Sequence, residues 1–175
     1  MRNKTLFLMI LLIAAIACSN AVNHKTETPL SPSSALYPPA PAFSIKSLDG
    51  KTVSLADMKG KVIFVNFWAT WCPPCRAEIP DFVEFYDENK TKGLEIIGLS
   101  LDEIEADSLL SFVKSNNMTY PVAFATKRII KDFDPGPYIP TTIIIDHQGR
   151  IRDKQVGGLD KETLDNWFQK LSAEK

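Results

Sequence analysis

One segment limits the possible folds more than any other part of this chain. Residues 61–69 (KVIFVNFWA) form a nearly continuous apolar run, which is typical of a central strand covered on both faces. The sequence CPPC follows at residues 72–75. Proline suits the first turn of a helix because its missing N–H has no intrahelical partner there, so we expect a helix from Pro73 to about Lys90, kinked at Pro80. The segment therefore predicts a buried strand that passes into a helix at a pair of cysteines.

The chain from Ala42 onward predicts one α/β domain. Apolar and polar residues alternate on both sides of Asp49-Gly50, which indicates a leading hairpin. The other expected strands are 94–101, 121–125, 141–146 and 151–156, and the other expected helices are 105–115, 127–133 and 160–171. Asp160 is the expected N-cap of the last helix, whose inner face would hold Leu164, Trp167, Phe168 and Leu171. This order predicts a mixed central sheet with helices on both faces.

The two cysteines of the CPPC sequence are spaced to form a disulfide across one helical turn. The first turn of a helix carries partial positive charge and free amide groups, which stabilise the thiolate of Cys72 and lower the pKa of its thiol. We therefore expect Cys72 to be the nucleophile, exposed at the start of the helix. Cys75, one turn inside and less exposed, would attack the mixed disulfide and release the reduced substrate. Pro74 removes a second amide and stiffens the turn.

Other functions of paired cysteines need residues that this chain does not supply. A structural zinc site needs about four Cys or His ligands, and besides the pair the sequence offers only Cys18, His24 and His147. A c-type haem attachment needs a histidine after the second cysteine, where the chain has Arg76. A structural disulfide usually joins distant elements rather than adjacent turns. We therefore predict a redox pair, with no metal and no cofactor beyond a Cys72–Cys75 disulfide.

The N-terminus has the features of a targeting signal. Arg2 and Lys4 precede an unbroken apolar run, residues 6–17, which is well short of the ~20 residues that a membrane-spanning helix needs. The run ends in Ala15-Ile16-Ala17-Cys18, which resembles a bacterial lipobox, so residues 1–17 are predicted to be a signal peptide and Cys18 to carry a lipid. More than one acyl chain would attach the protein stably to a lipid bilayer, outside the cytoplasm. A plain secretory signal with an unmodified Cys18 is the alternative.

A spacer is predicted between this signal and the domain. Residues 18–41 contain five prolines with several Ser, Thr and Asn, and such a segment does not bury enough apolar surface to fold by itself. The domain is therefore placed at residues 42–175. Lys and Arg total 20 against 21 Asp and Glu, which argues against a nucleic acid as partner because phosphate binding needs a basic surplus.

These features together resemble the thioredoxin superfamily, and within it the extracytoplasmic TlpA/ResA-like thiol:disulfide oxidoreductases. The resemblance rests on FWATWCPPC (67–75), the following RAEIP (76–80), the leading hairpin, and IPTT (139–142) before a buried strand. It implies a thioredoxin fold across the domain, with the hairpin as an N-terminal addition. It also implies that Pro140 is a cis-proline beside the cysteines, which presents the backbone of Ile139 to an extended substrate.

The same resemblance implies an enzyme that exchanges disulfides with protein substrates. Proteins of this kind usually act as reductases, for example keeping apocytochrome thiols reduced in cytochrome c biogenesis, and receive electrons from a thiol donor in the membrane. We therefore expect a membrane-anchored protein-disulfide reductase, which faces the periplasm if the cell has two membranes. The direction of exchange depends on the reduction potential, which residue types alone do not fix.

Two residues bear on proton transfer. Asn66 occupies the strand position where cytoplasmic thioredoxins carry a buried Asp that assists deprotonation of the second cysteine, and an amide cannot do this. Glu78 lies three residues after Cys75, on the same helix face, and resembles the acid found just after the motif in ResA-like proteins. We expect Glu78 to move the proton, as a partly buried carboxylate with a raised pKa. The alternative is a solvated glutamate that stabilises the helix dipole.

Substrate contact is expected around the cysteines. Trp71 would form one side of the rim, and Ile139 with Tyr138 the opposite lip, aimed by the rigid turn DPGP at residues 134–137. Trp68 alternates inward and is predicted to be part of the core. The predicted substrate-binding residues are Trp71, Pro73, Pro74, Ile139 and Pro140.

Two other functions stay open at this point. A copper-carrying chaperone of similar architecture would use a distal histidine and two cysteines separated by three residues; here two residues separate them, and His147 is the one histidine in the domain. His147 itself is expected to be a solvated residue of the turn 147–150. A peroxiredoxin-like peroxidase shares the fold but sets its cysteine in a Pro-x-x-x-Thr-x-x-Cys loop, and residues 65–71 contain no proline.

Overall fold

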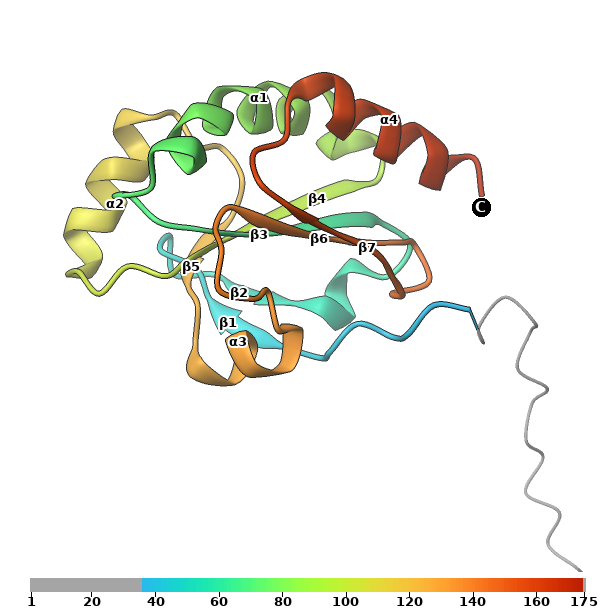
Figure 1. The fold of residues 1–175 in the computed structure, drawn as a ribbon, viewed down its shortest axis with the longest axis horizontal. Coiled ribbons are helices and arrows are strands. Elements are labelled where there is room, and N and C mark those ends of the chain that lie inside the picture. The colour runs from blue at the N-terminus through green and yellow to red at the C-terminus, as the bar shows by residue number, and fades with distance from the viewer. Residues whose placement is uncertain (1–35, 175) are drawn as a thin grey trace, which may run out of the picture. The chain divides into compact units, whose positions relative to one another are not determined.

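A five-stranded sheet forms the centre of the domain in a computed structural model, which describes residues 36–174. The strand order is β5-β4-β3-β6-β7 (Figure 1). The strands are β3 (Val62–Trp68), β4 (Leu94–Ser100), β5 (Val122–Phe124), β6 (Thr141–Ile145) and β7 (Ile151–Val156). Because β3 pairs parallel with β4 and antiparallel with β6, the sheet is mixed, as predicted.

Helices cover both faces of this sheet. α1 (Pro73–Asn89) and α4 (Lys161–Ser172) contact each other on one face, and α3 (Lys127–Phe133) lies on the other (Figure 1). The predicted N-terminal hairpin is present as β1 (Ser44–Lys46) and β2 (Thr52–Ser54), on the same side as α3. Within the described residues, the remaining helical elements are α2 (Ala106–Ser115) and two short 3-10 helices, η2 (Leu55–Met58) and η3 (Lys90–Lys92). The predicted α/β architecture and element order are confirmed.

β3 is buried along its whole length and takes part in two apolar cores. Phe64 and Trp68 belong to the core under α1 and α4, whereas Val65 and Phe67 belong to the core under α3 and the hairpin. This is the alternation that a strand imposes on successive side chains. Full burial of such a side chain contributes about 1.5–3 kcal/mol, so the strand that leads to the cysteines is stabilised from both faces.

The two helices beside β3 begin where the sequence predicts. α1 remains helical through Pro80, although the proline has no N–H to donate to the preceding turn. At the start of α4, the side chain of Asp160 accepts a 2.9 Å hydrogen bond from the N–H of Thr163. Leu164, Phe168 and Leu171 are buried as predicted. Trp167 is half-buried instead, with the Lys170 Nζ 4.6 Å from its ring centroid.

The domain includes residues upstream of the predicted boundary at Ala42. The N–H of Ala40 donates to the carbonyl of Gly149 at 2.9 Å, and the N–H of Ile151 donates to the carbonyl of Pro38 at 2.8 Å. The last residues of the predicted spacer therefore extend the sheet edge at the β6–β7 turn, because a proline-rich segment still offers backbone carbonyls to a neighbouring strand.

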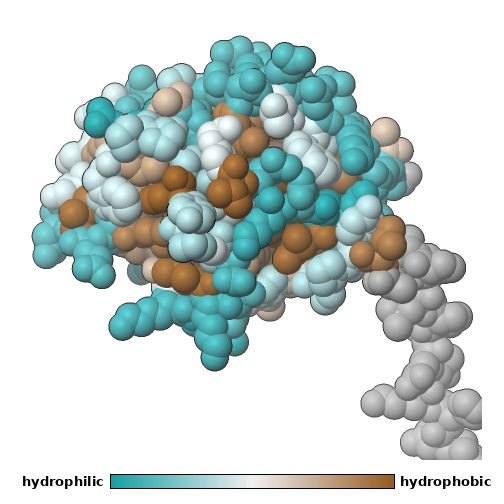
Figure 2. All heavy atoms as spheres, viewed as in Figure 1, coloured by the Kyte–Doolittle hydropathy of each residue, from teal (hydrophilic) through white to brown (hydrophobic). Residues whose placement is uncertain are grey.

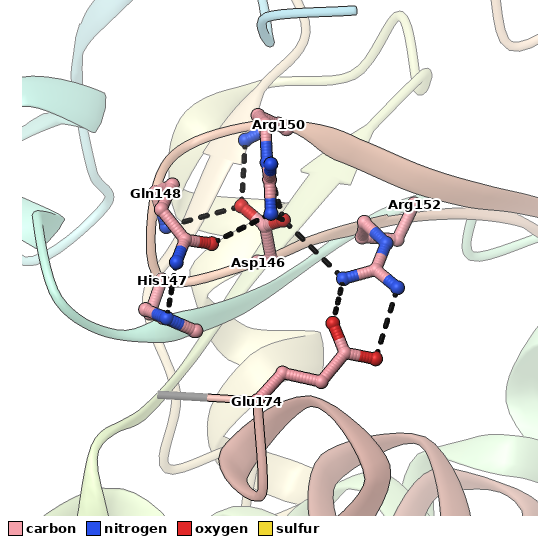
Figure 3. Close-up of polar contacts among 6 residues, drawn as sticks. All are labelled: Asp146, His147, Gln148, Arg150, Arg152 and Glu174. Atoms are coloured by element: carbon pink, nitrogen blue, oxygen red, sulfur yellow. Dashed lines mark hydrogen bonds and ion pairs between the residues drawn. The ribbon is translucent and has the colours of Figure 1, made fainter. Parts of the chain in front are cut away.

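Asp146 joins this turn to the end of α4 (Figure 3). Its fully buried carboxylate pairs with Arg150 at 2.8 Å and with Arg152 at 3.4 Å. Arg152 also pairs with Glu174 and lies over the ring of Tyr37, 4.2 Å from its centroid. Such partners stabilise a buried carboxylate, so this network holds together residues from three parts of the chain.

The predicted signal peptide, Cys18 and residues 18–35 of the predicted spacer lie outside the described residues. Their assignments stay predictions. Within residues 36–174, none of the helices has the length and apolar character needed to cross a bilayer.

Candidate active site

β3 leads to the two cysteines at its carboxyl end. Trp68 ends the strand, residues 69–71 turn, and Cys72 lies at the start of α1. Cys72 and Cys75 are joined by a disulfide with an S–S distance of 2.11 Å and a Cα–Cα distance of 5.3 Å. The predicted disulfide is therefore present, at the predicted junction of strand and helix.

The start of α1 directs one amide at the first sulfur. Cys72 is the N-cap residue, and its Sγ accepts a hydrogen bond from the N–H of Cys75 at 3.3 Å. Pro73 and Pro74 occupy the first two helical positions and have no N–H, so the Cys75 amide is the first donor that the helix can offer. This donor and the helix dipole both favour negative charge on the sulfur of Cys72.

Cys72 is less exposed than predicted. Only 3% of the residue is exposed, against 1% for Cys75. The carbonyl oxygen of Ile139 lies 3.7 Å from the Sγ of Cys72. The prediction of an exposed sulfur is wrong for this disulfide form, because the segment before β6 covers the helix start.

That segment carries the predicted cis-proline. Ile139 and Pro140 are joined by a cis peptide bond. Pro140 is buried and Ile139 half-buried, and the hydroxyl of Thr141 donates to the carbonyl of Tyr138 at 2.8 Å. The backbone of Ile139 is therefore held against the disulfide by the first residue of β6.

Exposed side chains surround the covered disulfide. Trp71 is 67% exposed and Tyr138 is 71% exposed, and Pro73 and Pro74 are also exposed. Trp68 is buried in the core, as predicted. Apolar side chains also form patches at the level of the sheet on the face shown in Figure 2, between the layer of α1 and α4 and that of α3. The predicted rim residues thus lie on two separate segments, one at each side of the disulfide.

Glu78 lies one turn after Cys75 and is 5% exposed. Its Oε1 accepts a hydrogen bond from the side-chain amide of Asn66 at 2.9 Å, and its Oε2 accepts one from the N–H of Leu159 at 2.9 Å. Burial raises the pKa of the Glu78 carboxyl to about 7, since it penalises the charged form more than these neutral donors favour it. The alternative of a solvated glutamate is therefore wrong.

Asn66 connects the Glu78 carboxylate to β6, the strand that follows Pro140. Its amide also donates to the hydroxyl of Thr142 on β6 at 3.0 Å. Neither Thr142 nor Leu159 was predicted to be a partner of the site. The strand pattern could have indicated Thr142, because a buried threonine needs a hydrogen-bond partner, whereas no local signal indicates the backbone of Leu159.

His147 lies beyond the other end of β6 from the cysteines. Figure 3 shows it beside Gln148 in the turn that follows Asp146, and its side chain is half-buried rather than solvated. β6 has five residues, and at a rise of ~3.3 Å per residue its first and last residues are about 13 Å apart. The histidine that the copper-carrier alternative requires is thus not beside the sulfurs. Residues 36–174 contain no cluster of three or more His, Cys, Asp or Glu that could hold a metal ion.

Comparison with known proteins identifies similar chains. A family model described as the AhpC/TSA family matches residues 38–154. A thiol-disulfide oxidoreductase ResA from Bacillus cereus is 42% identical over 134 residues, which cover 76% of this chain and 76% of that protein.

Solved structures give a consistent result. A thiol:disulfide interchange protein of the thioredoxin family from Chlorobium tepidum TLS superposes with a TM-score of 0.73 at 35% identity, covering 77% of this chain and 96% of that one. A secreted thiol-disulfide isomerase from Corynebacterium glutamicum superposes with a TM-score of 0.70 at 25% identity, covering 77% and 85%.

Proposed function

Because the chain belongs to the ResA-like thiol-disulfide oxidoreductases of the thioredoxin superfamily, we propose that it works as a reductase of protein disulfides outside the cytoplasm. Its fold is thioredoxin-like, with an additional two-stranded sheet at the N-terminus. The observation that carries the proposal is the Cys72–Cys75 disulfide, placed at the start of α1 and against the backbone of Ile139.

The reaction begins from the reduced pair. The thiolate of Cys72 attacks a substrate disulfide, forms a mixed disulfide, and expels one substrate thiolate. The thiolate of Cys75 then attacks Cys72, which closes the Cys72–Cys75 disulfide and expels the second substrate thiolate. The substrate gains two electrons and two protons, and the enzyme loses them. The amide of Cys75, 3.3 Å from Cys72 Sγ, supports the nucleophile at the first step.

Glu78 is the proposed proton acceptor for Cys75 in the second step. A carboxyl with a pKa of about 7 holds its proton and releases it with similar ease at neutral pH, which suits a general base and acid. Its hydrogen bonds to Asn66 and Leu159 orient the carboxylate. Asn66 acts here as a positioning residue and does not itself transfer a proton.

Substrate binding is assigned to the rim of the disulfide. The predicted set, Trp71, Pro73, Pro74, Ile139 and Pro140, lies on the two segments that meet at Cys72. An extended substrate segment would pair with the backbone of Ile139 in the manner of an added strand. Exposed Trp71 would contact the residues on either side of the substrate cysteine.

The cellular setting is proposed from the N-terminal sequence and one structural neighbour. Residues 1–17 have the features of a signal peptide, and Cys18 is the proposed lipid attachment site. A similar chain, the isomerase from Corynebacterium glutamicum, is described as secreted. We therefore place the enzyme at the outer side of a membrane, where a membrane thiol donor would reduce it and it would in turn reduce the disulfides of apocytochromes or of other proteins.

The reduction potential tests the proposed direction. The full chain is equilibrated in glutathione and dithiothreitol buffers, and the fraction of the Cys72–Cys75 disulfide is measured. We expect a reduction potential close to that of thioredoxin, about −270 mV. A potential close to that of a strong oxidant, about −120 mV, would overturn the reductase assignment. The Cys75→Ser variant is the control, because it cannot form the intramolecular disulfide.

A further inference from the structure

A second buried carboxylate lies beside the cysteine turn, and the proposed reaction does not use it. Asp102 follows β4, the parallel neighbour of β3, and is 6% exposed. Its side chain contacts the turn at residues 69–71, where the N–H of Thr70 donates to Oδ2 at 2.9 Å and the hydroxyl of Thr70 donates to Oδ1 at 2.6 Å. The ends of β3 and β4 are thus connected beyond the last sheet hydrogen bonds.

A third donor completes the environment of this carboxylate. The hydroxyl of Ser100 donates to Oδ2 of Asp102 at 2.7 Å and accepts from the N–H of Asp102 at 3.0 Å. Among the ion pairs of residues 36–174, none involves Asp102. The three donors around Asp102 are all neutral, and each directs a hydrogen at an oxygen. A carboxylate accepts all three hydrogen bonds at once, whereas an Asn in its place would offer one oxygen and would keep the remaining contact only if a hydroxyl reversed its role and accepted from the amide.

Thr70, which donates to Asp102, lies two residues before Cys72, the proposed nucleophile. The neighbouring backbone is fixed as well, because the N–H of Leu101 donates to the carbonyl of Trp68 at 2.8 Å and the N–H of Cys72 donates to the carbonyl of Ala69 at 3.2 Å. Burying a carboxylate without a cation is costly. An uncharged residue could also form this turn. The cost of burying the Asp102 carboxylate therefore indicates that the turn must be held rigid.

We propose that Asp102 is a positioning residue for Cys72, which holds the Thr70 turn so that the sulfur of Cys72 stays aligned with the amide of Cys75. This inference rests on the proposed function, in which Cys72 is the nucleophile. The alignment matters because, among residues 36–174, the amide of Cys75 is the one that donates to the sulfur, at 3.3 Å, and Pro73 and Pro74 have no N–H to donate. When the turn loosens, this hydrogen bond weakens, the thiolate is less stabilised, and the pKa of the Cys72 thiol rises.

The decisive variant is Thr70→Val, which keeps the charge of Asp102 and nearly the shape of Thr70 but removes one donor. The reduced full chain is alkylated with iodoacetamide over a range of pH, and peptide mass spectrometry follows Cys72. At a fixed pH below the thiol pKa, we expect the alkylation rate to fall about three- to tenfold, in proportion to the thiolate fraction. Thr70→Ser restores the donor and should restore the rate. Asp107→Asn removes an exposed charge from the first turn of α2 and should leave the rate unchanged.

Asp102→Asn separates positioning from simple electrostatics. If Asp102 acted only through its negative charge, Asp102→Asn would raise the alkylation rate of Cys72 and Thr70→Val would have no effect, which would overturn the proposal. A loss of stability to urea in Thr70→Val with an unchanged alkylation profile would overturn it too. In the double variant, we expect a rate no lower than in Asp102→Asn alone, because both changes release the same turn. Alkylation needs no protein substrate, so a wild-type chain that reduces no protein disulfide would refute the proposed function and leave this measurement intact.

Discussion

The side-chain amide of Asn66 donates a 2.9 Å hydrogen bond to the carboxylate of Glu78. Asn66 lies on β3 and Glu78 on α1, so this bond joins the strand that leads to the cysteines with the helix that holds them. Neither Asn66 nor the backbone of Leu159 carries a charge that could offset the burial of Glu78. The carboxyl therefore keeps a pKa of about 7 instead of its ordinary value of 4.5.

Glu78→Gln should remove the proton acceptor without changing the shape of the site. We expect reduction of a protein disulfide to slow by about 10²-fold at neutral pH, the lower range for loss of a general base. The pH–rate profile should also lose an inflection near 7, where the wild-type carboxyl titrates. Glu84→Gln, on an exposed position of the same helix, is the control and should keep the wild-type profile. An unchanged profile in Glu78→Gln would contradict the proposed role.

The raised pKa of Glu78 also predicts how stability varies with pH. The folded-state pKa lies above the unfolded value, so the protonated carboxyl favours the folded chain. This contribution is fully present below about pH 4.5 and is lost as the pH rises through about 7. Relative to Glu78→Gln, the wild type should therefore lose about 3 kcal/mol of unfolding free energy between these limits. Urea unfolding of both oxidised chains at several pH values measures the difference, and a constant difference would refute the assignment.

Cys75→Ser should stall the reaction at its intermediate. Because Cys72 Sγ receives the amide of Cys75 and meets the backbone of Ile139, we assign the first attack to Cys72. Cys75→Ser should accumulate mixed disulfides with substrate proteins, seen as reducible adducts on non-reducing gels. Cys72→Ser is the matched control and should accumulate far fewer. Adducts that form equally with both variants would mean that either sulfur attacks first.

The two tryptophans next to the motif should respond differently to truncation. Trp71 is 67% exposed and Trp68 only 1%. Trp71→Ala should leave the unfolding free energy within about 0.5 kcal/mol while raising KM for a protein disulfide. Trp68→Ala should lower the unfolding free energy by about 3–5 kcal/mol, because it leaves a cavity in the core. Urea unfolding and steady-state kinetics on both variants test the division, and an unchanged KM in Trp71→Ala would remove it from the substrate rim.

Local patterns predict much of this fold because they are enforced locally. The apolar run at residues 61–69, the prolines after Cys72 and the N-cap at Asp160 all specify an element or its start, and β3, α1 and α4 are found there. The cis bond before Pro140 followed from the family resemblance rather than from residue chemistry.

Local sequence patterns do not predict contacts between distant segments. The carbonyl of Ile139 covers the sulfur of Cys72 across 67 positions, so the exposure of that sulfur could not be judged from its place at a helix start. The carboxylates of Glu78 and Asp102 are satisfied by donors from other elements. A sequence shows that a polar residue is present, but it does not show which donors the packing will bring to it.

The pairing of Pro38 and Ala40 with the β6–β7 turn affects which surfaces of the domain a substrate protein can reach. The incoming chain joins the domain at one end of β6, and the disulfide lies at the other end, beside Pro140. Residues 38–40 therefore leave free the surface around Cys72 at which a substrate would dock.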